Sequence, residues 1–147
     1  MQSDKKEYRY KGQCLCGSVQ YAVAKLEPRM AHCHCTMCRK FHGAAFATFG
    51  EARFENFTWL RGGQHLKTYR ADNGSKRQFC DQCGSSMTFS PANDNGEYVE
   101  FSLGTLDTDI EIRPDAHIYT AYCANWYEIM DNLPQYAESR LSDRKKI

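Results

Sequence analysis

Short runs in which apolar and polar residues alternate recur along the chain, with glycine-bearing turns between them. Residues 18–24 place Val19, Tyr21 and Val23 on one face, which is the pattern of a half-buried strand. Residues 44–49 form a continuous apolar run that predicts a buried strand ending at Gly50. The same patterns predict further strands at residues 8–12, 30–35, 54–60, 66–70, 77–80, 86–89, 98–103 and 117–121.

Helical patterns are short in this chain. Thr36 is expected to cap a helical turn that runs through Cys38 to His42. Residues 126–139 are expected to form short helical turns that break at Pro134. No long stretch has the helical period, so the fold class is mainly β, with two packed sheets or a partly open barrel.

The size of the chain, 147 residues, predicts a single domain, and its 41% hydrophobic content fits a globular protein. We expect this domain over residues 8–139, a disordered tail over 1–7 and a charged tail over 140–147. The polar N-terminal segment lacks the apolar region of a signal peptide, and no run is long enough to span a bilayer. We therefore expect a cytoplasmic protein with no membrane partner.

The formal net charge is +1, which gives no global field to attract a polyanion. No nucleic-acid partner is therefore expected. The sequence does not indicate an oligomeric state.

Eight cysteines are present, and seven of them fall into close groups. In a reducing compartment, clustered cysteines are metal ligands more often than disulfides. The groups are Cys14 with Cys16, Cys33 with Cys35 and Cys38, and Cys80 with Cys83, while Cys123 stands alone.

The C-x-C pair at Cys14 and Cys16 and the C-x-x-C pair at Cys80 and Cys83 are interpreted as two halves of one site. Two intervening residues let both thiolates of a C-x-x-C turn reach one metal, and Gly84 permits the turn. Together the four thiolates predict a closed structural zinc site. The alternative is a redox-active C-x-x-C pair, although no βαβ pattern surrounds it.

The remaining three grouped cysteines form the pattern C-x-C-x-x-C. In an extended segment Cys33 and Cys35 point to one face, and a tight turn can bring Cys38 to the same point. Three protein ligands and one open position are the pattern of a catalytic zinc. Three thiolates make that zinc a weak Lewis acid, but it can hold an incoming thiol as a thiolate, which favours thiol chemistry over hydrolysis.

Several alternatives remain open around this second group. The fourth position can be closed by His32, His34, His42 or Cys123, which would make the site structural, although His34 should point away from the metal. Cys123 also fits a small buried side chain. The pair Arg39 and Lys40 can hold an anionic substrate group or form a solvated face, and His117 can be a structural residue or a general acid.

Taken together, three segments carry a recognisable pattern: Gly12–Tyr21, Cys33–Lys40 and Arg77–Ser85. The chain resembles the glutathione-dependent formaldehyde-activating enzyme family, which also includes centromere protein V. Further matching positions are Gly104–Asp107, Pro114, His117–Tyr119 and Trp126–Pro134, so the resemblance extends from Tyr8 to Tyr136. One departure is Tyr122-Cys-Ala-Asn125, where many relatives carry Ser-Lys-Ala-Pro.

The resemblance implies a single-domain β-tent fold of small antiparallel sheets, stapled by two zinc ions. It implies that Cys14, Cys16, Cys80 and Cys83 are structural ligands and that Cys33, Cys35 and Cys38 hold a catalytic zinc. The implied activity is that of a carbon–sulfur lyase or synthase with a small thiol substrate, such as the formation of S-hydroxymethylglutathione from formaldehyde and glutathione. The alternative function is a non-catalytic binding module stapled by zinc.

Overall fold

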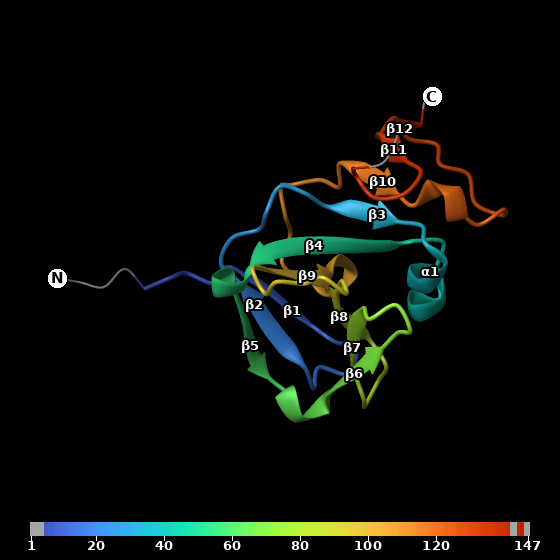
Figure 1. Ribbon diagram of the computed structural model, residues 1–147. Helices are drawn as coiled ribbons and strands as arrows, with labels where there is room; N and C mark the ends of the chain where they lie inside the picture. Colours follow the sequence, from blue (N-terminus) through green and yellow to red (C-terminus); the bar gives the residue numbers. More distant parts are fainter. Residues whose placement is uncertain (1–4, 142–143, 146–147) are drawn as a thin grey trace. The chain divides into compact units, whose positions relative to one another are not determined.

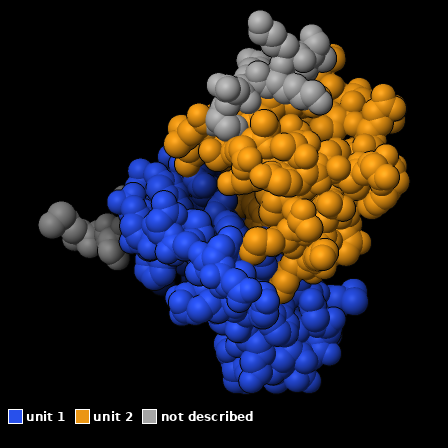
Figure 2. Space-filling model, turned by 45° about the vertical axis from the view of Figure 1, so that its right-hand side comes forward, with its two compact units in different colours: residues 1–27, 51–111 blue, residues 28–50, 112–147 orange. Residues whose placement is uncertain are grey.

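The computed structural model describes residues 5–141 and 144–145. The predicted tail over 1–7 therefore lies partly outside the described residues, and residues 5–7 have no regular secondary structure. The chain divides into two compact units, each made of two separate stretches of sequence (Figure 2). Unit 1 comprises residues 1–27 and 51–111, and unit 2 comprises residues 28–50 and 112–147.

Unit 1 contains a three-stranded antiparallel sheet in the order β1-β2-β5 and a series of antiparallel strands in the order β9-β8-β7-β6 (Figure 1). Short 3-10 turns connect these strands. The strands are β1 (Tyr10–Gln13), β2 (Gln20–Val23), β5 (Phe57–Arg61), β6 (Leu66–Arg70), β7 (Lys76–Cys80), β8 (Ser86–Ser90) and β9 (Tyr98–Ser102). The 3-10 turns are η1 (Phe54–Asn56), η2 (Gly63–His65) and η3 (Leu103–Thr105).

The core of unit 1 is built around Tyr21, a fully buried residue of β2. Its ring stacks on Phe57 at a centroid distance of 5.2 Å and meets Phe101 at 5.4 Å. A buried phenol needs a partner, and its hydroxyl lies 2.8 Å from Thr105 Oγ1. Val19, Tyr21 and Val23 are all buried as predicted, but Ala22 on the opposite face is buried as well, so β2 is covered on both faces and is not half-buried.

Unit 2 contains a small mixed sheet and a single α-helix among the described residues. Its strands are β3 (Ala31–Cys33), β10 (Ala116–Ile118), β11 (Gln135–Tyr136) and β12 (Arg144–Lys145). Strand β4 (Ala47–Arg53) begins in unit 2, where it pairs antiparallel with β3, and ends in unit 1. The helix is α1 (Thr36–His42), and the 3-10 turn η4 (Thr120–Tyr122) follows β10.

Strand β10 departs from the antiparallel pattern, because it runs parallel to both β3 and β11. Its register places His117 opposite His32 and Ile118 opposite Cys33. This register brings the side chain of His117 next to the cysteine-rich segment, although His117 and His34 are 83 positions apart in sequence.

The mainly β class built of small sheets is confirmed, and several local predictions are wrong. The strand predicted over 54–60 begins only at Phe57, because residues 54–56 form η1. The strand predicted over 117–121 ends at Ile118, because Tyr119 has a positive φ and η4 follows it. The strand predicted over 44–49 does not end at Gly50, because β4 continues to Arg53 and buries Ala52 on the way. Residues 126–139 contain no helix and instead form turns and β11. The helix α1 is capped by the sulfur of Cys35, which accepts a hydrogen bond from the Cys38 backbone N–H, and Thr36 is its first residue rather than its cap.

The predicted charged tail over 140–147 lies partly outside the described residues, at 142–143 and 146–147. Within it, Arg144 and Lys145 form β12 and pair antiparallel with β11. Among the helices of residues 5–141, none has the length and apolar character needed to cross a bilayer.

Candidate metal centres

The first cysteine cluster lies within unit 1 and unites the C-x-C and C-x-x-C pairs. The four sulfur atoms of Cys14, Cys16, Cys80 and Cys83 all lie within 4.8 Å of one another. The Cys14–Cys16 and Cys16–Cys80 sulfur distances are 3.6 and 3.8 Å. A tetrahedral zinc with Zn–S bonds of about 2.3 Å has sulfur–sulfur edges of about 3.8 Å, so these spacings fit such an ion.

Local backbone structure forms this cluster. Strand β7 ends at Cys80, and the turn to β8 is closed by a hydrogen bond from the Gly84 N–H to the Cys80 carbonyl at 2.7 Å. Gly84 adopts a φ of 80°, a left-handed conformation that side chains other than glycine rarely take. The Gln82 N–H donates to Cys80 Sγ, and the Val19 N–H donates to Cys14 Sγ. Both contacts stabilise negative charge on sulfur.

Three thiols of the first cluster have pKa values that differ from the ordinary value. A hydrogen bond with Ser18 lowers the pKa of Cys16. Burial opposes ionisation of Cys83, but hydrogen bonds with Ser85 lower its pKa to about 6. Burial raises the pKa of Cys80 to about 11. Four thiolates this close are stable together only if a positive ion lies among them, since like charges otherwise repel.

The second cluster lies within unit 2, at the junction of β3 and α1. Cys33 is the last residue of β3, Cys35 caps α1, and Cys38 lies in its first turn. Their three sulfur atoms lie within 4.8 Å of one another. Cys33 and Cys38 are buried, while Cys35 is partly exposed. The predicted convergence of these three residues is present, and the helix provides the turn that the spacing required.

The electrostatics of the second cluster suit a soft divalent metal. Hydrogen bonds with Cys35 and Cys38, together with burial, raise the pKa of Cys33 well above its ordinary value. The Cys33 thiol therefore resists ionising beside the other two thiols unless a cation compensates the charge. Thiolates select soft metals such as zinc. The residues present fit such an ion.

Within the described residues, no fourth His, Cys, Asp or Glu joins the second cluster. His34 lies between two of its cysteines in sequence, and its side chain is fully buried against other partners. Cys123 likewise contacts His34, with its sulfur 3.5 Å from His34 Nδ1. Neither residue closes the cluster, so the position expected for an external ligand has no protein ligand in this part of the chain.

A buried polar chain adjoins the second cluster, and sequence reasoning did not predict it. His34 Nε2 lies 2.8 Å from His117 Nδ1, and His117 Nε2 lies 2.9 Å from Asp131 Oδ2. Burial, and then the proximity of His117, lowers the pKa of His34 to about 4. His117 has partners at both ring nitrogens, which agrees with the structural interpretation of this residue. Asp131 lies in the segment Trp126–Pro134, which matches the family, but no role was predicted for its side chain.

Two further side chains lie near the second cluster. Tyr119 is the one described residue other than glycine with a positive φ, at 56°. Burial and the neighbouring thiols of the cluster raise the pKa of its phenol. Arg39 acts on the pKa of His34, and its buried Nε has no hydrogen-bond partner among the described residues. A buried guanidinium N–H without a partner is a donor available to an anionic ligand.

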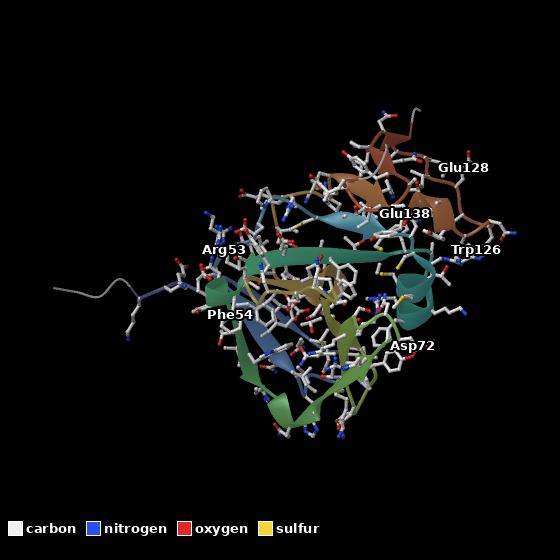
Figure 3. The ribbon with its side chains drawn as sticks, in the orientation of Figure 1. Arg53, Phe54, Asp72, Trp126, Glu128 and Glu138 are labelled. Carbon is white, nitrogen blue, oxygen red and sulfur yellow. The ribbon has the colours of Figure 1, made fainter. Side chains whose placement is uncertain are left out.

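The loop after η4 carries polar and aromatic side chains of unit 2. Figure 3 labels Trp126 and Glu128 on this loop, and Glu138 further along the chain. Trp126 is 69% exposed. The Glu138 carboxylate accepts a hydrogen bond from the Tyr122 hydroxyl at 2.8 Å, and its backbone carbonyl accepts one from the Tyr119 N–H. These two contacts hold η4, which follows Tyr119 and leads to Cys123.

The family profile described as glutathione-dependent formaldehyde-activating enzyme matches residues 9–122, which include both cysteine clusters. The chain belongs to this family. The resemblance inferred from the cysteine motifs is thereby confirmed.

Two relatives of this protein come from a bacterium and a yeast. A Halomonas elongata protein provisionally named glutathione-dependent formaldehyde-activating enzyme is 27% identical over 141 residues, covering 90% of this chain and 83% of that protein. An uncharacterized lyase of Schizosaccharomyces pombe is 26% identical over 89 residues. That match covers 60% of this chain and 63% of the yeast protein, less than two thirds of its length.

The fold also has a counterpart among solved structures. A crystal structure of a Rhodobacter sphaeroides protein, determined as a structural genomics target, superposes with a TM-score of 0.57 at 27% sequence identity. The superposition covers 69% of this chain and 91% of that protein. The predicted fold class is therefore supported by a relative of known structure.

Proposed function

We propose that this protein is a zinc-dependent carbon–sulfur lyase or synthase that acts on thiol adducts. The reaction we favour joins glutathione and formaldehyde to give S-hydroxymethylglutathione, or cleaves that product in reverse. We assign the activity to the domain over residues 8–139 and to the cytoplasm, where glutathione is reduced. Family membership and the names of the relatives support this class of reaction.

A single observation carries the proposal. Three sulfur atoms converge within 4.8 Å, and no fourth His, Cys, Asp or Glu of the described residues joins them. Three protein ligands and an open position characterise catalytic zinc sites, whereas structural sites are closed. By the same rule, the cluster of Cys14, Cys16, Cys80 and Cys83 would hold a structural zinc and stabilise the fold.

The two clusters would have different roles in the reaction. A zinc ion held by Cys33, Cys35 and Cys38 would supply a soft positive charge that favours the ionised form of an incoming thiol. Burial of Cys33 and Cys38 removes water from one side of that position. Proximity then brings the sulfur nucleophile and the aldehyde together in a fixed orientation.

The reaction needs no redox partner. The substrate sulfur donates an electron pair to the aldehyde carbon, a carbon–sulfur bond forms, and the carbonyl π electrons move to oxygen. The oxygen takes up one proton, which balances the proton lost by the thiol. The reverse reaction breaks the same bond and releases thiol and aldehyde.

Arg39 is our candidate for binding an anionic group of the thiol substrate. Its Nε is buried without a partner among the described residues, and its charge is felt at His34, next to the cluster. Glutathione carries two carboxylates, and a guanidinium donates charge-assisted hydrogen bonds to such groups.

The roles of the two clusters can be separated by a pair of matched substitutions. In Cys35→Ser, a partly exposed ligand of the open cluster is altered, so turnover should be abolished while the protein remains folded. In Cys80→Ser, a buried ligand of the closed cluster is altered, so the fold itself should be lost. Circular dichroism and a coupled formaldehyde assay measure both effects. Equal loss of folding in the two variants would contradict a catalytic second cluster.

Calorimetric titration of the zinc-loaded protein tests the thiol substrate directly. Glutathione should bind at one site per chain, and Cys35→Ser should remove that binding. If no small thiol binds while both zinc ions are present and resistant to thiol titration, the protein is instead a binding module stapled by zinc.

A further inference from the structure

The chain of hydrogen bonds through His34, His117 and Asp131 lies entirely within unit 2. Both histidine side chains are buried, with 0% and 1% of their surface exposed, whereas the Asp131 side chain is 47% exposed. The chain therefore begins in the interior, beside Cys33 and Cys35, and ends at a carboxylate that reaches solvent.

For a neutral His117, the direction of every hydrogen bond in this series follows from its outer end, the carboxylate of Asp131. An ionised carboxylate can only accept, so His117 must carry a proton on Nε2 and donate it to Asp131. A neutral imidazole then has its lone pair on Nδ1, and this nitrogen accepts from His34 Nε2–H. His34 Nδ1 is left as an acceptor, and the nearest donor is the Cys123 thiol at 3.5 Å.

Asp131 is held in the ionised state that this direction requires. Partial burial raises the pKa of Asp131. Hydrogen bonds from His117 and from the Leu133 N–H lower this pKa by more than burial raises it, so the net change is downward. The Leu133 N–H lies 3.0 Å from Oδ1, while His117 Nε2 lies closer to Oδ2. The two donors thus bind the two oxygens of one carboxylate.

Ring packing reinforces the hydrogen bonds. The His34 ring lies 5.0 Å from that of Phe46 and 6.2 Å from that of Tyr127, measured between centroids. The His117 ring lies 4.8 Å from that of His32. The His34 ring therefore has little freedom to rotate, and both of its nitrogens are engaged.

We propose that Asp131 and His117 are positioning residues that keep the His34 ring turned away from the second cluster and so preserve its open coordination position. His34 stands between Cys33 and Cys35, so a fixed ring also fixes the backbone that carries these two ligands. Outer partners that orient metal-binding residues contribute strongly to metal affinity in general. The inference rests on the metal that the proposed function assigns to this cluster.

Zinc affinity measures the effect. A chromogenic chelator competing for zinc should show two sites in the unmodified protein, one for each cluster. Asp131→Ala removes the acceptor at the exposed end of the chain and should weaken the second site about 10–100-fold. Asp131→Asn should not restore the affinity, because with its amide oxygen bound to the Leu133 N–H its NH₂ group lies at the Oδ2 position, 2.9 Å from His117 Nε2, where it donates instead of accepting.

A matched control separates positioning from general loss of stability. Thr105→Val breaks a partly buried hydrogen bond of similar length, the 2.8 Å contact to the Tyr21 hydroxyl, within unit 1. This variant should lose stability and keep the zinc affinity of the second cluster. His117→Phe interrupts the series of hydrogen bonds at its centre. If His117→Phe does not fold, Asp131→Ala provides the test, because its side chain is half exposed.

Nitrogen-15 NMR of the zinc-loaded protein reports which ring nitrogen of each histidine carries the proton. The spectrum can be assigned because the protein has only five histidines. His34 and His117 should both carry their proton on Nε2, and neither should be bound to metal. In Asp131→Ala the His34 signal should show mixed tautomers. A proton on Nδ1 of His34 in the unmodified protein would overturn the inference.

The two outcomes that matter can be distinguished. If the unmodified protein binds a single zinc, at the first cluster, the proposed function fails and the positioning role fails with it. If it binds two, but Asp131→Ala and His117→Phe leave both the second affinity and the His34 tautomer unchanged, only the positioning role is overturned.

Discussion

At the scale of single residues, the second cluster is surrounded by side chains in unusual states. His34 is buried and neutral, Tyr119 has a left-handed backbone, and Arg39 has a buried donor without a partner among the described residues. Such residues are costly to a fold and are concentrated at functional sites. Their presence around one cysteine cluster supports the proposal that this cluster has a role beyond folding.

Tyr119 allows a direct test of backbone strain. A non-glycine residue in the left-handed region costs about 1–2 kcal/mol. We therefore expect Tyr119→Gly to be more stable than Tyr119→Ala by about 1 kcal/mol, the reverse of the usual preference. Chemical denaturation of the two variants measures this difference, in which the loss of the ring cancels. Equal stability of the two would show that the residue is not strained.

Asp131 gives a prediction for pH. Its pKa is lowered in the folded protein, so its stabilising effect is fully present above its unfolded pKa and is lost as the pH falls through the folded value. The stability gap between the unmodified protein and Asp131→Asn should be constant from pH 7 to pH 5 and shrink below about pH 4. Because the carboxylate is half exposed, the gap should be at most about 1 kcal/mol. Urea titrations at each pH check this, and a gap that widens in acid would contradict it.

At the scale of secondary structure elements, short strands and tight turns bring the sulfur ligands together. The turn between β7 and β8 carries two ligands of the first cluster, and the β3–α1 junction carries all three of the second. Neither cluster depends on a long loop. The geometry of each metal-binding turn is therefore set by local backbone conformation.

The turn at Gly84 offers a clean test of this dependence. A Cβ at Gly84 or at Gly104 would meet nothing within 4 Å, but only Gly84 has a positive φ, at 80°. Gly84→Ala should therefore destabilise the protein by about 1–2 kcal/mol, whereas Gly104→Ala should be nearly neutral. Thermal unfolding of the two variants makes the comparison. A similar loss in both would mean that the conformation of the turn does not matter.

The sequence predicts an element well when local residue patterns determine that element, and poorly when distant parts of the chain do. The strand over residues 66–70 and the helical turn from Thr36 to His42 follow from local patterns and agree with β6 and α1. The extension of β4 through Gly50 depends on burial of Ala52, which no local pattern reveals. The absence of helix over 126–139 has the same origin, because β11 forms by pairing with β10 and β12.

The candidate sites follow the same rule. Cysteine spacing predicts both clusters, because metal ligands cluster locally and the C-x-x-C turn has a fixed shape. The contact between His34 and His117 joins residues 83 positions apart and depends on the parallel pairing of β3 with β10. A parallel pair requires a long connection, so neither its partners nor its register is visible in a sequence window.

At the scale of the whole molecule, the two clusters differ in the number of sulfur ligands they offer, four in the first and three in the second. Each lies within one compact unit. Small sheets bury limited apolar surface, so a metal bound by the closed, four-sulfur cluster would contribute a large share of the stability of unit 1.

Chelation should therefore remove zinc in two phases. The three-sulfur cluster should release its ion first, with little change in circular dichroism, and the four-sulfur cluster should release its ion more slowly, with loss of the fold. A chromogenic zinc indicator follows both phases at once. Cys35→Ser should abolish only the fast phase. A single phase that coincides with unfolding would contradict different roles for the two clusters.

The interleaving of the two units along the chain has a consequence for biosynthesis. The first cluster cannot be completed until Cys83 has left the ribosome, because its two halves lie on either side of the stretch 28–50. The ligands of the second cluster span only residues 33–38 and can meet as soon as that short stretch emerges. A nascent chain in a zinc-poor cell would thus present the reactive three-sulfur turn before the scaffold that surrounds it exists. We therefore expect the second cluster to be able to bind metal before the first cluster during synthesis.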